Sequence, residues 1–118
     1  MKLLTKVLRE KLIKNNNVNL AAILKDGNTT DFKPVVKLFN PVGASTWLIS
    51  ELDPETNIMF GLCYLGYGTP ELGYVSLDEL TEMKLAFGLG IERDITWEAE
   101  KTLSAYADEA RERGCINV

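Results

Sequence analysis

Carboxylate side chains are the groups in this sequence best suited to chemistry, because the chain contains no histidine. Without histidine, Ser-His-Asp catalysis and zinc sites of the HExxH kind are excluded. Glu51 and Asp53 lie two positions apart in the segment Trp47–Asp53, so on a strand both carboxylates leave the same face. Such a pair can bind a divalent cation or act as acid and base, whereas acids beside a turn are more often only solvated.

Further carboxylates follow at Glu71, Glu92 and Asp94. If they met the first pair at one end of a sheet, they would form a metal site of the phosphodiesterase kind. One functional hypothesis is therefore a metal-dependent nuclease or other phosphodiesterase that uses Glu51, Asp53 and Glu71, with a divalent metal as cofactor. The other hypothesis, an interaction protein, needs no cofactor.

A glycine- and tyrosine-rich segment, Gly66–Tyr74, follows the first carboxylates. Its glycines resemble a phosphate-binding loop, but no GK[ST] and no helix start follow, so a hairpin turn is the better interpretation. Tyr64, Tyr67 and Tyr74 either form an exposed aromatic surface for binding or pack at a sheet edge with wet hydroxyl groups.

A charged triplet lies near residue 93, where an arginine is flanked by two acids. This arginine serves either as a pre-oriented guanidinium or, more commonly, in an ion pair that holds a loop. The candidate interaction residues of the whole chain are Trp47, Tyr67, Glu71, Tyr74, Glu92, Arg93 and Asp94.

The apolar pattern predicts an α+β domain: a small antiparallel sheet, a meander of about four strands, packed with N-terminal and C-terminal helices. Leu4, Leu8 and Leu12 recur every four residues and predict an amphipathic basic helix that asparagines 15–17 end. The predicted segments are a helix over 1–14, a linker over 15–33, antiparallel strands over 34–75, and helices with a short extended segment over 76–113.

Local signals set the details of the strands and the last helices. Strict alternation places Leu48, Ser50 and Leu52 on one face of a strand, and Trp47, Ile49, Glu51 and Asp53 on the other. Ser76 and Glu79 have the spacing of a capping box, and Gly88 and Gly90 are expected to end the helix that starts there. Thr96 is expected to cap the last helix.

Composition indicates one ordered domain, because 118 residues with 46% apolar and 25% charged side chains suffice for a single core. The start of the chain has no apolar signal-peptide core, and no apolar run approaches the length of a membrane span. Cys63 and Cys115 have no CxxC spacing and are expected to be reduced thiols. These features predict a cytoplasmic protein with no membrane contact.

Charge is distributed unevenly along the chain. Residues 1–40 carry eight basic and three acidic side chains, and residues 41–118 carry five and fourteen, which gives net charges of +5 and −9. The ordinary interpretation is two solvated helix faces. The alternatives are that the basic end contacts a phosphate backbone, or that the acidic part occupies a nucleic-acid site on another protein. Direct nucleic-acid binding is disfavoured, because the acidic part would repel a duplex.

Longer motifs resemble a known family. The pieces are TWLISELDP, FGLCYLGYGTPELGYVSLDEL, IERD and KTLSAYA, within residues 33–107. They resemble an uncharacterised bacterial family of small proteins, named only as a domain of unknown function and carried on plasmids, conjugative elements and phages. The resemblance implies no activity, cofactor or catalytic residue. Tyr64 departs from it, because many relatives are expected to have Asp there, which weakens the nuclease hypothesis.

The preferred hypothesis is a small accessory protein of a mobile genetic element that acts through a protein partner. A counter-defence role suits the genetic setting that the resemblance implies and the acidic part of the chain. It requires the acids to lie in one exposed stripe and predicts binding that weakens as salt rises. The sequence leaves the partner and the oligomeric state open.

Overall fold

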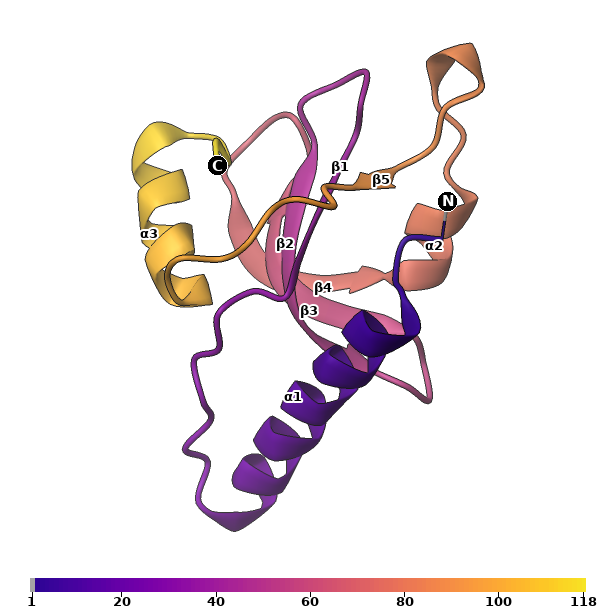
Figure 1. Cartoon of the computed structure of the whole chain (residues 1–118). Coiled ribbons are helices and arrows are strands. Elements are labelled where there is room, and N and C mark those ends of the chain that lie inside the picture. Colours follow the sequence, from indigo (N-terminus) through magenta and orange to yellow (C-terminus); the bar gives the residue numbers. More distant parts are fainter. Residues whose placement is uncertain (1) are drawn as a thin grey trace.

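The computed structural model describes residues 2–118, which form one antiparallel sheet with helices on both faces (Figure 1). The strands lie in the order β4-β3-β2-β1-β5, and all neighbours are antiparallel. The predicted α+β class and its strand meander are confirmed, and β5 adds a fifth strand beside β1. The strands are β1 Val36–Phe39, β2 Thr46–Asp53, β3 Ile58–Tyr64, β4 Glu71–Ser76 and β5 Glu92–Arg93.

The helices differ in length and in how they contact the sheet. They are α1 Lys6–Lys25, α2 Leu77–Glu82, the 3-10 helix η1 Ala86–Gly88 and α3 Leu103–Arg113. We call the two faces of the sheet the α2 face and the α3 face, after the helix that packs on each. Within residues 2–118, every helix is too short or too polar to cross a lipid bilayer.

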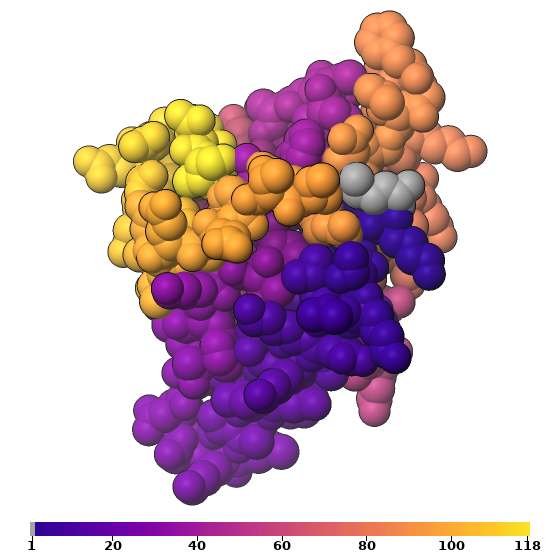
Figure 2. All heavy atoms as spheres, viewed as in Figure 1, coloured from indigo at the N-terminus to yellow at the C-terminus, as the bar shows by residue number. Residues whose placement is uncertain are grey.

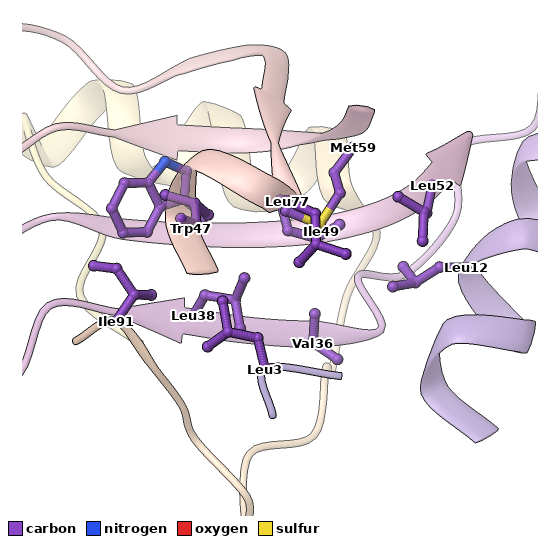
Figure 3. Packing of buried hydrophobic residues seen from close by; sticks show 11 residues of the cluster. Leu3, Leu12, Val36, Leu38, Trp47, Ile49, Leu52, Met59, Leu77 and Ile91 are labelled. Carbon is purple, nitrogen blue, oxygen red and sulfur yellow. The ribbon is translucent and has the colours of Figure 1, made fainter. Parts of the chain in front are cut away.

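Each face buries its own hydrophobic cluster. Residues that alternate along the strands separate into the two clusters, as period-two side-chain directions require. The α2 face buries Leu3, Leu12, Val36, Leu38, Trp47, Ile49, Leu52, Met59, Leu77, Leu80 and Ile91, most of which are labelled in Figure 3. The α3 face buries Leu48, Leu62, Leu103, Tyr106, Ala107 and Ala110.

A β-bulge at Ser50 changes the face assignment in β2. The register with β3 shifts between Ile49 and Glu51, so Ser50 is an extra residue in the strand. Glu51 therefore lies on the α3 face, and Leu52 lies on the α2 face with Ile49. Strict alternation predicted the opposite for Glu51 and Leu52 and was wrong, because a bulge offsets the period by one residue.

Helix α1 is longer than predicted and covers the open edge of β2. β1 pairs only with residues 46–49, and α1 packs against the second half of β2 instead, where Asn15 Nδ2 donates to the Ser50 carbonyl at 3.0 Å. Asn19 is buried and its Nδ2 donates to the Thr30 carbonyl. The prediction that the asparagines end the helix was wrong, because these tertiary hydrogen bonds override their low helix propensity.

Helix α1 continues past the sheet. Figures 1 and 2 show that the last part of α1 and the turn after it project below the body of the molecule. Leu20, Ile23 and Leu24 on this part are exposed. The predicted linker over residues 15–33 therefore shrinks to the segment that follows α1.

The last helices also differ from the prediction. Ser76 caps α2, since its Oγ accepts from Glu79 N at 3.1 Å as the capping box predicts. However, α2 ends at Glu82 rather than at the glycines, because only its first turn reaches the core. The following segment projects from the surface around η1 (Figure 2).

Helix α3 begins later than Thr96, which was the expected cap. Thr96 instead donates to Asp94 in a turn, and Thr102 occupies the N-cap position without a capping hydrogen bond from its side chain. The capping acceptor is a residue distant in the sequence, because Ser104 N donates to Asp31 Oδ1 at 3.1 Å. Sequence-local rules do not find such a cap, because its donor and acceptor are 73 positions apart.

Candidate functional site

A hollow of about 460 Å³ lies on the sheet beside the turn that joins β3 to β4. We call it the edge pocket. Four of the candidate interaction residues line it: Trp47, Tyr67, Glu71 and Tyr74. They come from β2, from the turn after β3 and from β4, so only the folded sheet brings them together. Its lining also includes Cys63, Thr69 and Gly73, which were not among the candidate interaction residues.

Trp47 forms the inner wall of the edge pocket. Its side chain is 2% exposed, and among residues 2–118 its Nε1 is the only buried side-chain polar atom without a hydrogen-bond partner. In Figure 3 the indole nitrogen lies on the side of the ring away from Leu38 and Ile91, which places it toward β3 and the pocket. A buried indole N–H that makes no hydrogen bond costs about 1–3 kcal/mol, so it favours an acceptor that enters the pocket.

The floor of the pocket is open because β4 has a glycine there. A Cβ at Gly73 would meet no atom within 4 Å. Gly73 pairs with Gly61, whose own Cβ position would lie 2.1 Å from the Leu48 carbonyl oxygen. Gly61 thus serves close packing of strands, whereas Gly73 leaves space at the surface.

Tyr67 and Tyr74 both contribute to the lining of the edge pocket, but the ring of Tyr74 lies on the α3 face. Tyr67 is 75% exposed and Tyr74 is 77% exposed, so both are accessible to a partner. Tyr74 also contacts Phe60 on the α3 face, with ring centroids 5.2 Å apart. Tyr64 is half-buried and does not line the pocket.

Cys63 lies in the wall of the pocket, and its cross-strand neighbour on β4 is Glu71. Burial raises the pKa of the Cys63 thiol to about 11. The side chain is therefore a neutral thiol at physiological pH and contributes a weakly polar wall rather than a nucleophile.

The carboxylates of the metal hypothesis do not converge. Glu71 is in register with Cys63 and lies on the α2 face, whereas Glu51 is in register with Phe60 and lies on the α3 face. Asp53 Oδ1 accepts from Glu55 N in the β2–β3 turn. Within residues 2–118, no group of three His, Cys, Asp or Glu side chains is placed to hold a metal ion, so the convergence that the metal hypothesis requires is not found.

Glu51 has a structural contact on the α3 face. Asn19 Nδ2 donates to Glu51 Oε2 at 3.0 Å. Burial raises the pKa of Glu51, and the hydrogen bond from Asn19 opposes this rise only in part. The side chain links α1 to β2.

The charged triplet Glu92, Arg93 and Asp94 makes contacts within the fold and does not line the edge pocket. Arg93 Nη1 donates to the Leu3 carbonyl at 2.6 Å, and the Asp94 carboxylate lies 3.8 Å from Lys37 Nζ. Glu92 pairs with Phe39 in the sheet. Because β5 is at the opposite edge of the sheet from β4, these residues and the edge pocket form separate regions.

The acidic side chains lie on both sides of the sheet, not in a single stripe. Asp78, Glu79 and Glu82 are exposed on α2, and Asp108 and Glu109 lie on α3 at the other face. Asp108 and Glu109 are in ion pairs with neighbouring basic residues. Glu71 is the acid that lines the edge pocket, and the acids of α2 follow β4 along the chain.

Comparison with known proteins places the chain in a family without assigning an activity. A search of the curated proteins and a search of the solved structures each returned no match. One family model, described as "Protein of unknown function (DUF2958)", matches residues 3–117. Because this match spans almost the whole sequence, the chain belongs to the family described as "Protein of unknown function (DUF2958)".

Proposed function

We propose that this protein is a small accessory protein that acts by binding another protein, and that the edge pocket is its contact site. The observation that carries the proposal is the unpartnered Nε1 of buried Trp47 beside an open hollow of about 460 Å³. Exposed Tyr67, which lines the pocket, supports it, because tyrosine supplies contact area and hydrogen bonds at protein interfaces.

The chemistry of the pocket favours an uncharged or basic occupant. None of the residues that define the pocket is basic, and Glu71 is its only acid. An anionic ligand would meet the Glu71 carboxylate without a compensating cation. A protein side chain that accepts a hydrogen bond from Trp47 suits the pocket better than a phosphate.

The cellular setting is part of the same proposal. A cytoplasmic location and a role on a plasmid, conjugative element or phage rest on the sequence resemblance. A counter-defence activity is not proposed, because it required the acids to lie in one exposed stripe, whereas they lie on both sides of the sheet. The contact site itself rests on the geometry of the pocket. A metal-dependent phosphodiesterase is not proposed, because Glu51 and Glu71 lie on different faces.

The test compares four forms of the protein as bait in an extract of the host cell. Gly73→Val adds a side chain at the floor of the pocket, where a Cβ meets no atom within 4 Å, and Trp47→Phe removes the indole N–H while keeping an aromatic ring. Trp97→Phe is the matched control, because Trp97 packs on Tyr106 away from the pocket. The protein that the wild type recovers is then purified and titrated against each form.

We expect the wild type and Trp97→Phe to recover the same protein, and Gly73→Val and Trp47→Phe to bind it at least about tenfold more weakly. Binding of a basic partner should weaken as salt rises, because Glu71 lines the pocket. Recovery of the same proteins by all four forms, or of nucleic acid alone, would overturn the proposal.

A further inference from the structure

The outer edge of β4 carries unpaired backbone N–H and C=O groups at every second residue. β4 is the last strand of the sheet, and its residues pair only with β3. Leu77 N donates to the Asn57 carbonyl at 2.9 Å, in the same register as the β3–β4 pairs. Hydrogen-bonded pairs alternate with open pairs in an antiparallel ladder, so Gly73 and Val75 bond inward to β3. The backbone N–H and C=O groups of Leu72 and Tyr74 therefore point outward.

This edge lacks the features that usually protect an edge strand. β4 has six residues and contains neither lysine nor proline, which natural proteins use to block edge pairing. The opposite edge is formed by β5, which has two residues. Within residues 2–118 no backbone hydrogen bond is made to the outward groups of Leu72 and Tyr74. β4 is thus a longer and less protected place than β5 for another strand to pair.

The surroundings of the edge select the charge of a partner. Glu71 begins β4, and α2, which directly follows β4, exposes Asp78, Glu79 and Glu82. A basic segment is attracted to these acids. A second copy of this chain would instead bring two sets of the same acids to one edge, and like charges oppose such pairing.

Side-chain alternation links the edge to the edge pocket. A strand added beside β4 directs alternate side chains to the α2 face, over Gly73 and toward Trp47 Nε1. The intervening side chains lie on the α3 face, next to the Phe60–Tyr74 ring pair. The added segment therefore carries hydrogen-bonding and basic side chains on one side and apolar side chains on the other.

We infer that a partner protein binds by adding an extended basic segment to β4 as a sixth strand, with one oxygen-bearing side chain in the edge pocket. Main-chain hydrogen bonds to Leu72 and Tyr74 supply affinity in this binding mode, and the pocket supplies specificity. The inference rests on the proposed function and adds to it the binding mode and the chemistry of the partner segment.

The test uses a defined peptide, acetyl-Lys-Val-Gln-Val-Lys-Val-amide, which has this pattern. Hydrogen exchange measured by NMR on the full chain should show slower exchange of the Leu72 and Tyr74 amides when the peptide is added. A peptide with glutamate in place of both lysines should bind at least about tenfold more weakly. Two further peptides carry methyl groups on alternate backbone amides, one at the valines and the other at the remaining residues. Because only one of these two sets of amides faces β4, one peptide should lose binding and the other should keep it.

A matched pair of variants isolates the backbone contact. Leu72→Pro removes an outward N–H and leaves the bonds to β3, whereas Leu72→Ala removes the side chain and keeps that N–H. Circular dichroism first establishes that both variants fold. Peptide affinity should fall at least about tenfold for Leu72→Pro and stay within about threefold for Leu72→Ala.

Each contrary result has its own meaning. Failure of the basic peptide to protect the two amides at millimolar concentration overturns strand addition, whether or not the pocket variants lose their protein partner. Equal binding of the acidic peptide overturns the assignment of a basic segment. Protection that rises with protein concentration in the absence of peptide assigns the edge to a second copy. A different result would contradict the proposed function itself: Gly73→Val recovers the protein partner from the extract as well as the wild type does.

Discussion

At the scale of single side chains, burial decides what the titratable residues can do. Cys63 and Glu51 both have a raised pKa, and in each the largest cause is desolvation. The sequence identified Glu51 as a candidate for chemistry from its spacing to Asp53. It gave no sign of the buried contact with Asn19, because that contact depends on α1 running past its asparagines.

Cys63 should react slowly with alkylating reagents. With its pKa at about 11, its thiolate fraction at about pH 8 is on the order of a hundredfold below that of an ordinary cysteine. Timed iodoacetamide labelling followed by peptide mass spectrometry measures the rate at Cys63, with an unstructured cysteine peptide as reference. Equal rates at both sites would contradict the burial of the thiol.

Replacing Glu51 with glutamine should stabilise the protein more at neutral than at acidic pH. A raised folded-state pKa means that the contribution of Glu51 to stability is complete at low pH and is lost as pH rises through the folded pKa. Glu51→Gln keeps an oxygen acceptor for Asn19 and removes the buried charge. Urea unfolding of both proteins at about pH 4 and about pH 7 should show the larger gain at about pH 7.

At the scale of secondary structure, the sequence predicted which elements exist better than where they end. The β-branched and aromatic runs identified β1 to β4, and Ser76 was correctly placed as the cap of α2. The ends of α1 and the start of α3 were wrong, because Asn15, Asn19 and Asp31 act through hydrogen bonds to distant residues. The pocket was predicted only as separate candidates, since its lining residues come from three strands and a turn that the sequence does not place relative to one another.

Asp31 should stabilise α3 even though it lies outside the helix. Burial alone would raise the pKa of Asp31, but hydrogen bonds from the side chain and backbone of Ser104 bring the pKa below its usual value of 3.8. Asp31→Ala should cost about 1 kcal/mol of unfolding free energy at neutral pH, as for loss of a helix cap. Because the folded pKa is lowered, the difference from wild type should shrink as pH falls below 3.8 in urea-unfolding experiments. A cost that does not change with pH would show that the carboxylate charge plays no part.

The backbone of β4 should exchange hydrogen in an alternating pattern in the free protein. Gly73 and Val75 amides bond to β3, whereas the Leu72 and Tyr74 amides point outward, so the second pair should exchange faster. NMR-detected exchange on the wild type measures all four amides in one experiment. Uniform protection along β4 would show that its outer side is already covered.

At the scale of the whole molecule, a few long-range hydrogen bonds connect the first residues of the described chain to the sheet. Arg93 in β5 donates to the carbonyls of Lys2 and Leu3, about ninety positions away in the sequence. These bonds hold Leu3 in the cluster on the α2 face. The sequence suggested an ion pair for Arg93 and missed this contact, because its acceptors are backbone groups.

Arg93→Ala should destabilise the protein by about 1–3 kcal/mol, since it removes charge-assisted hydrogen bonds to backbone carbonyls beside the core. Arg111→Ala is the control, because Arg111 is in an exposed ion pair with Asp108 and should change stability by less than about 0.5 kcal/mol. Thermal and urea unfolding of the two variants measure the difference. Similar effects of both substitutions would contradict a special role of Arg93.

The bulge at Ser50 has a consequence for comparing chains of this family. Because Ser50 is an additional residue in β2, deleting it would leave Ile49, Glu51 and Leu52 on the faces they already occupy. Relatives can therefore differ in length by one residue at this point and keep the same buried pattern. What a deletion would remove is the carbonyl that Asn15 contacts, so the gain or loss of this residue should accompany changes in α1 rather than in the sheet.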